Sequence, residues 1–117
     1  MPTRDQARAL HAYRAVAQVG ADQQGDYKIA VNDLGANILR SGLCAAIASV
    51  QRLGQRGYVL LGHLASADVP GLDGATAQDL AQRVYELDAD SYMLATRELL
   101  QVTTWLKRAV QATFNGE

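Results

Sequence analysis

The sequence predicts an all-α fold, a single-domain bundle of five to six helices that ends in a long amphipathic helix. A stretch near the C-terminus, 90–114, contains neither proline nor glycine. Apolar residues make up 49% of the chain, and alanine supplies much of this share, whereas aromatic residues account for only 6%. Alanine favours helices over strands, and no alternating segment is long enough to predict a strand.

Length, charge and cysteine content limit the classes of protein that this chain fits. With 117 residues, we expect one domain, 1–117, with one core. The formal net charge of -1 excludes a globally basic nucleic-acid binder but leaves a local basic patch open. No apolar run reaches transmembrane length, the N-terminus lacks a signal-peptide core, and the lone Cys44 fits a reducing compartment. These features predict a cytoplasmic protein without membrane contact.

The first helix is expected to begin after Thr3, which can form a capping box with Gln6 three residues later. Gly20 should end it, and 21–25 should form a polar connection. Helical periodicity assigns its apolar face to Ala9, Leu10, Tyr13, Val16 and Ala17. The same periodicity places Arg4, Arg8, His11 and Gln18 on the opposite side.

Three further helices are expected between Asp26 and Ala67. The second should start with Asp26 as its N-cap and bury Tyr27, Ala30, Val31, Leu34 and Ile38. Gly35 in its middle indicates close packing or a kink. The third helix should cover 43–53, followed by a short basic connection at Gln55–Arg56. The fourth, 58–67, is apolar on several sides, so the bundle or a partner must cover it.

The remaining chain is expected to form a loop and two helices. The loop covers 68–75, because Pro70 disfavours a helical conformation at Val69. Thr76, with Asp79 three residues later, should open the fifth helix, and Asp88 should help to cap the last one. The apolar stripe of the last helix is centred on Leu99 and includes Tyr92, Ala95, Leu106, Val110 and Thr113.

Nothing in the sequence favours catalysis or metal binding. His11, His63 and Cys44 lie on three different expected helices without the spacing of a metal site. Cys44 lacks a neighbouring base, so a buried structural thiol is the simpler interpretation. The aspartates concentrate in loops and at helix starts, where capping explains them. We therefore expect no enzyme activity, no metal and no cofactor.

The basic residues are the strongest functional signal. Nine of the eleven are arginines, which bind phosphate through two parallel hydrogen bonds. Acidic partners four residues away are scarce: Arg8 has none, and Arg52 and Arg56 have only each other. Two interpretations remain at this point, a solvated surface or a surface that binds an acidic partner.

Three stretches together resemble the small subunit of the Cmr effector complex, the type III-B CRISPR interference machine. They are ARALHAYRAV (7–16), YKIAVNDLGANILRSGLCAAIASV (27–50) and YMLATRELLQVTTWLKRAVQATF (92–114). The most specific part is 95–98 followed by 105–108. The resemblance implies a non-catalytic helical bundle. Its implied partners are the large polymerase-like subunit, the repeated backbone subunits, copies of itself, guide RNA and target RNA.

The resemblance also implies contacts to RNA phosphates that are independent of sequence, because base pairing with the guide supplies specificity. The candidate RNA-binding residues are Arg14, Arg40, Arg52, Arg56, Lys107 and Arg108. Trp105 is expected in the bundle core, with a subunit contact and then base stacking as the alternatives. The alternative function is a helical protein–protein adaptor with no nucleic-acid contact, which the near-neutral net charge supports.

Overall fold

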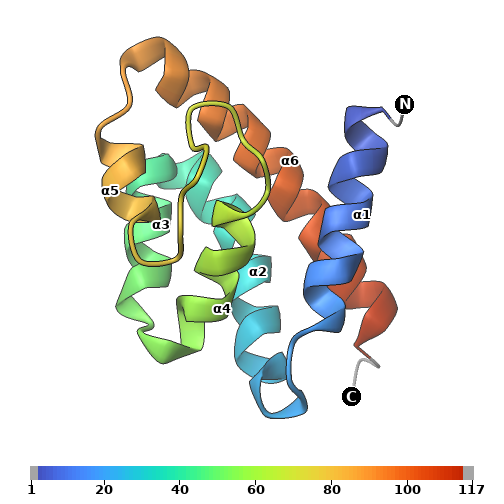
Figure 1. Cartoon of the computed structure of the whole chain (residues 1–117). Helices are drawn as coiled ribbons and strands as arrows, with labels where there is room; N and C mark the ends of the chain where they lie inside the picture. Colours follow the sequence, from blue (N-terminus) through green and yellow to red (C-terminus); the bar gives the residue numbers. More distant parts are fainter. Residues whose placement is uncertain (1–2, 115–117) are drawn as a thin grey trace.

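The computed structural model describes residues 3–114, and these form helices without any strand (Figure 1). The helices are α1 (Arg4–Ala17), α2 (Gln24–Ser41), α3 (Leu43–Arg52), α4 (Gln55–Ala65), α5 (Leu80–Tyr85) and α6 (Ala89–Thr113), with a short 3-10 helix, η1 (Ala21–Gln23), before α2. The predicted all-α bundle with a long C-terminal helix is confirmed. Among the described residues, no helix is long and apolar enough to span a membrane.

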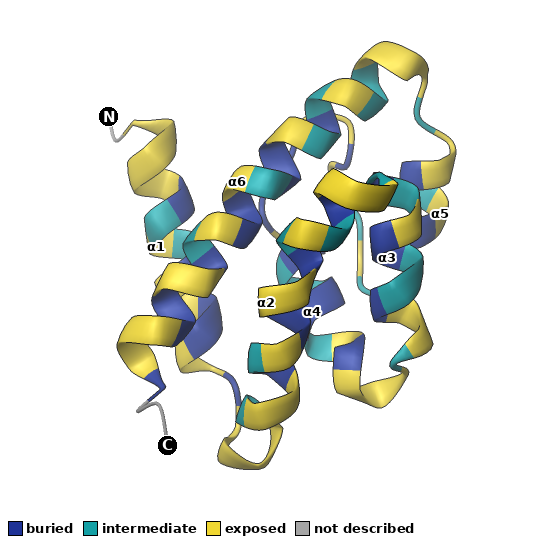
Figure 2. Cartoon of the chain, turned by 180° about the vertical axis from the view of Figure 1, so that it is seen from behind, coloured by how far each residue is buried: buried dark blue, intermediate teal, exposed yellow. Residues whose placement is uncertain are grey.

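Two helices, α2 and α6, hold the bundle together. On one side, α1 packs along α6; on the other, α3 and α4 pack against α2, and α5 packs against α3 (Figure 1). Figure 2 shows that α2 and α6 each turn one exposed face outward and bury the other. As a result, α1 joins the bundle mainly through α6.

The core is built from the faces that periodicity predicted for α2 and α6. The α2 face is buried as expected, and on α6 the buried residues include Ala95, Leu99, Leu106 and Val110. Leu99 and Leu106 are at most 1% exposed, and burying a leucine side chain contributes about 1.5–3 kcal/mol. The stripe ends earlier than predicted, because Thr113 is exposed in the last turn.

The predicted N-caps of the first and last helices, α1 and α6, are confirmed. The Thr3 hydroxyl accepts from the Gln6 amide at 3.1 Å, and the Thr3 amide donates to the Gln6 side chain at 2.7 Å. At α6, the Asp88 carboxylate accepts from the Ser91 amide at 2.8 Å. Hydrogen bonds from the Ser91 amide and side chain hold the pKa of Asp88 below its ordinary value.

The apolar face predicted for α1 is largely wrong. Leu10 and Tyr13 are 51% and 41% exposed, and Ala17 is also exposed. The helix instead buries Arg8, Ala12, Ala15 and Val16. The physical reason lies on α6, where Arg8 pairs with the buried carboxylate of Glu98. The helix is therefore rotated away from its largest apolar side chains.

Three predicted boundaries differ from the structure. Helix α2 starts at Gln24, so Asp26 lies in its first turn and is not the cap. The predicted basic connection at Gln55–Arg56 is the first turn of α4, which ends at Ala65. The turn before it is made by Gly54 at φ 61°, a left-handed conformation that favours glycine. Gly57 then allows α4 to lie against α3, since a Cβ there would be 2.3 Å from the Val50 carbonyl oxygen.

The long loop between α4 and α5 is present, but α5 is shorter than predicted. Thr76 and Asp79 form reciprocal hydrogen bonds, with the Thr76 amide 2.7 Å from the Asp79 carboxylate. Regular helix nevertheless begins only at Leu80. Within the loop, Val69 and Leu72 are buried and anchor it to the bundle.

Candidate nucleic-acid interface

The six predicted RNA-binding residues all lie on the surface. Each is exposed, and within residues 3–114 no carboxylate lies at ion-pair distance from any of them. The ion pairs that form within residues 3–114 use other arginines, namely Arg4, Arg8 and Arg83. The positive charges of the six are therefore available to a partner outside the described chain.

The six residues do not form one patch. Arg52 ends α3 and Arg56 lies in the first turn of α4, so these two share one end of the bundle. Arg40 lies in the last turn of α2, next to the start of α3, and α3 is about 15 Å long. Arg14 lies on α1, and Lys107 and Arg108 lie together on α6. The structure therefore distributes the candidate cations over several sides of the molecule.

The pair at the α3–α4 turn is electropositive for two reasons. First, Arg52 and Arg56 are near each other in the chain and carry the same charge. Arg52 also donates a hydrogen bond to the Ser49 hydroxyl at 3.3 Å. Arg56 also lies at a helix N-terminus, where the helix dipole disfavours a positive charge. A bound anion would relieve both unfavourable interactions.

On α6, Arg108 lies over the indole ring of Trp105. The Cζ atom of the guanidinium is 4.8 Å from the ring centroid, within the range of a cation–π interaction. Trp105 is partly buried and packs against the core, as predicted, but it also carries this surface cation. A shallow hollow lies beside the pair, bounded by Asp5 of α1 and by Leu100, Gln101 and Thr104 of α6.

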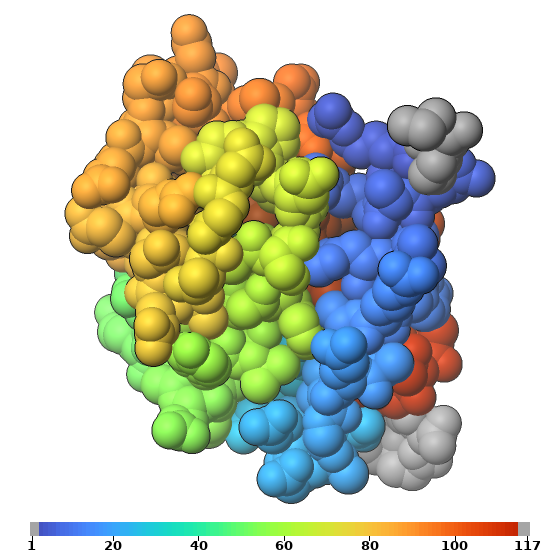
Figure 3. Space-filling model, in the orientation of Figure 1, coloured from blue at the N-terminus to red at the C-terminus, as the bar shows by residue number. Residues whose placement is uncertain are grey.

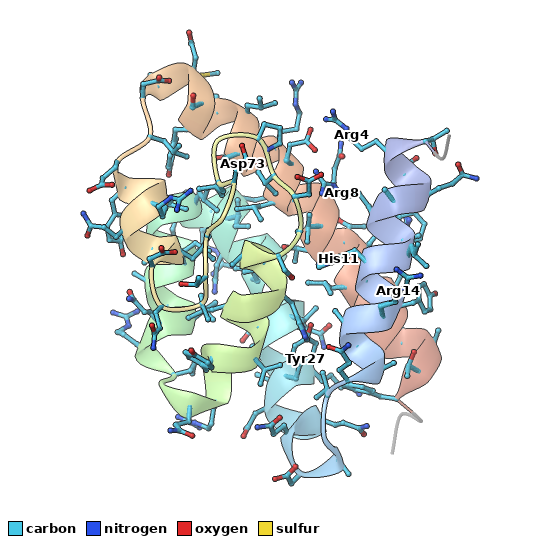
Figure 4. All side chains as sticks on the ribbon, viewed as in Figure 1. Arg4, Arg8, His11, Arg14, Tyr27 and Asp73 are labelled. Atoms are coloured by element: carbon cyan, nitrogen blue, oxygen red, sulfur yellow. The ribbon has the colours of Figure 1, made fainter. Side chains whose placement is uncertain are left out.

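A buried ion pair between α1 and α6 is the feature that the sequence did not reveal. Arg8 Nη2 lies 2.7 Å from Glu98 Oε1, and Arg4 Nη1 lies 2.9 Å from Glu98 Oε2. Arg8 also donates to the carbonyl oxygen of Ala67, whereas its Nε has no acceptor among the described residues. Figure 4 shows Arg4 and Arg8 reaching from α1 toward α6. The expected position of Arg8 on the polar side of α1 is therefore wrong.

Glu98 remains ionised in this environment. Burial raises the pKa of its carboxyl group, but the hydrogen bonds and positive charges of Arg8 and Arg4 outweigh this, so the net pKa is lowered. The side chains of Arg8 and Glu98 are 6% and 5% exposed. The only available sequence signal was that Arg8 has no acidic residue four positions away on its own helix. That signal predicted an external partner as readily as one on α6.

The two histidines form a second polar connection. His11 Nε2 donates to the carbonyl oxygen of His63 at 2.9 Å, and the Tyr27 hydroxyl and His63 Nδ1 share a hydrogen bond of 2.8 Å. Burial lowers the pKa of His63 to about 4, lowers that of His11 and raises that of Tyr27. His63 is thus neutral at pH 7.

Neither the histidines nor the cysteine belongs to a metal site in the described part of the chain. No group of three or more potential ligands among residues 3–114 is placed to hold an ion. Cys44 is partly buried, and its backbone amide donates to the Tyr92 hydroxyl at 3.0 Å. A hollow of about 700 Å³ lies between α1 and the loop after α4 (Figure 3), and Arg8 and His11 are among its lining residues. Both side chains are already engaged in internal hydrogen bonds, Arg8 to Glu98 and His11 to the His63 carbonyl oxygen.

Comparison with known proteins identifies the family. The profile of the CRISPR-associated protein family Cas_Cmr5 matches residues 4–113. The CRISPR system Cmr subunit Cmr5 of Thermus thermophilus is 31% identical over 113 residues, which is 96% of each chain. The crystal structure of a CRISPR-associated Cmr5 family protein from the same species is also 31% identical. It covers 97% of this chain and 99% of that one, with a TM-score of 0.84. This chain therefore belongs to the Cmr5 family, the small subunits of the type III-B CRISPR Cmr complex.

Proposed function

We propose that this protein is a non-catalytic subunit that stacks along the Cmr complex and contacts the backbone of guide and target RNA. The RNA contacts are made by Arg14, Arg40, Arg52, Arg56, Lys107 and Arg108. The observation that carries the proposal is that all six are exposed and have no ion-pair partner among residues 3–114. Such cations neutralise phosphate charge and release counterions, without reading the base sequence.

The distribution of these cations suits an extended ligand. A compact anion would need the positive charges to converge, whereas those of this chain lie on several helices. An RNA duplex in a long groove can be touched by neighbouring subunits at successive phosphates, so each subunit needs only a few contacts. The affinity then comes from the assembly and not from one strongly basic surface.

Exposed apolar side chains support the protein contacts of the proposal. Ile29 and Leu39 on α2 are 62% and 77% exposed, and Met93 on α6 is 69% exposed. We assign these faces to contacts with the large polymerase-like subunit, the repeated backbone subunits and copies of this chain, in the cytoplasm. The non-catalytic role is supported by the internal hydrogen bonds of Glu98, His11 and His63, which already engage these groups structurally.

The salt dependence of RNA binding by the assembled complex tests the RNA contact. Replacing Lys107 and Arg108 together by alanine should weaken guide–target RNA association and reduce the slope of log K against log salt by about one per lost phosphate contact. Arg97→Ala is the matched control, because Arg97 is an exposed cation of α6 outside the candidate set. If alanine at each of the six positions leaves the slope unchanged, the RNA contact is refuted and the assembly role remains.

The exposed Leu39 and Met93 also favour a second function, a helical adaptor that contacts only proteins. Ribonuclease treatment of the purified complex separates the two. An adaptor should keep its contacts with the other subunits after ribonuclease treatment. Alanine variants of the six cations should then weaken its affinity for those subunits and leave the salt dependence of RNA binding by the complex unchanged.

A further inference from the structure

We infer that Trp105 is a positioning residue that holds the Arg108 guanidinium in place for an RNA phosphate. This inference rests on the proposed function, because it concerns how one of the proposed contacts is made. It starts from the position of Arg108 Cζ over the indole ring, 4.8 Å from the ring centroid.

The two residues differ in how they are held. Trp105 packs against the hydrophobic core and is partly buried, so the core fixes its ring. Arg108 is exposed, has no ion-pair partner among residues 3–114 and lies three residues further along α6. Residues at this spacing are neighbours on a helix surface. The indole therefore restricts a side chain that would otherwise sample many rotamers.

Restriction by a ring leaves the hydrogen-bonding edge of the guanidinium free. A guanidinium that stacks on an aromatic ring uses its flat face, whereas phosphate binding uses N–H donors in its plane. The same arginine can therefore stack on Trp105 and bind phosphate at the same time. Because part of its rotamer entropy is already lost before binding, less is lost on contact with RNA.

The neighbouring cation provides an internal comparison. Lys107 is also exposed on α6, but it lies two residues from Trp105, on a different side of the helix. If stacking positions the cation, Trp105 should affect the contribution of Arg108 and not that of Lys107. A merely structural role of Trp105 would affect both.

The test is a set of double-mutant cycles in the assembled complex, with RNA affinity and its salt slope as readouts. Trp105→Leu, which keeps an apolar side chain for the core, should weaken binding by about two- to fivefold. Trp105→Phe should retain most of the affinity. In an Arg108→Ala background, Trp105→Leu should have no further effect, whereas in a Lys107→Ala background its effect should be undiminished.

Each outcome has a defined meaning. If Trp105→Leu weakens binding equally in both backgrounds, Trp105 contacts the RNA directly or acts through the fold, and the positioning role is wrong. If Arg108→Ala weakens binding but Trp105→Leu does not, the inference fails and the proposed function survives. If Arg108→Ala itself has no effect, the proposed Arg108–phosphate contact is refuted, and the inference with it.

Discussion

Removing the charge of Glu98 should destabilise the protein more than an ordinary surface substitution. Glu98→Gln keeps the size of the side chain but leaves Arg8 buried without a counterion. Removing one partner of a buried ion pair lowers the free energy of unfolding by about 3–5 kcal/mol. The ion pair between Arg4 and Glu98 accounts for at most about 1 kcal/mol of this, because the Arg4 side chain is 61% exposed. Glutamine keeps one acceptor oxygen, so we expect about 3 kcal/mol, a lowering of Tm by about 12 °C.

Chemical unfolding followed by circular dichroism measures this change. Glu86→Gln is the matched control, since Glu86 is exposed and its substitution should change stability by less than about 0.5 kcal/mol. Replacing Arg8 and Glu98 together by methionine should restore much of the loss, because no unpaired charge remains in the interior. A loss below about 1 kcal/mol for Glu98→Gln would refute the assignment of a buried, ionised pair.

Two further predictions concern acid stability and helix packing. His63 has a folded-state pKa of about 4 against an ordinary value of 6.5, so the unfolded chain takes up a proton first as the pH falls. The contribution of neutral His63 to stability is therefore complete above pH 6.5 and is lost as the pH falls from 6.5 to 4. After allowance for solvent screening, this loss of stability is about 1–2 kcal/mol. In the His63→Gln variant, the difference in Tm between pH 7.5 and pH 4.5 should be smaller than in the unmodified protein, and an unchanged difference would contradict the role of His63. Gly57→Ala should cost about 1–3 kcal/mol because its Cβ would collide with the Val50 carbonyl oxygen, whereas Gly25→Ala, with nothing within 4 Å, should stabilise α2; equal effects on Tm would rule out the close approach.

The elements that depend on local chemistry could be predicted from the sequence. Helix α6 follows from an uninterrupted run with a strong apolar period, and the Thr3 and Asp88 caps require partners only three residues away. The buried face of α2 follows from the same periodicity. These interactions lie within one helix, so neighbouring residues in the sequence contain all the necessary information.

The orientation of α1 could not be predicted, because a residue 90 positions away decides it. Local periodicity favoured burial of Leu10 and Tyr13, which are larger than the alanines that the helix actually buries. Placing Leu10 inward would have turned Arg8 away from Glu98 and left that carboxylate buried alone. The cost of an unpaired buried charge exceeds the gain from covering one leucine, so the ion pair determines the rotation.

The same ion pair connects the fold to the proposed RNA surface. It fixes α1 on α6, and Asp5 of α1 borders the hollow that Arg108 lines on α6. We therefore expect the position of Arg14, further along α1, relative to Lys107 and Arg108 to depend on the pairing of Arg8 with Glu98. A Glu98→Gln subunit that still enters the complex should bind RNA with a smaller contribution from Arg14. Arg14→Ala should then weaken binding less in the Glu98→Gln background than in the unmodified protein, and an equal effect in both would show that α1 keeps its place without the pair.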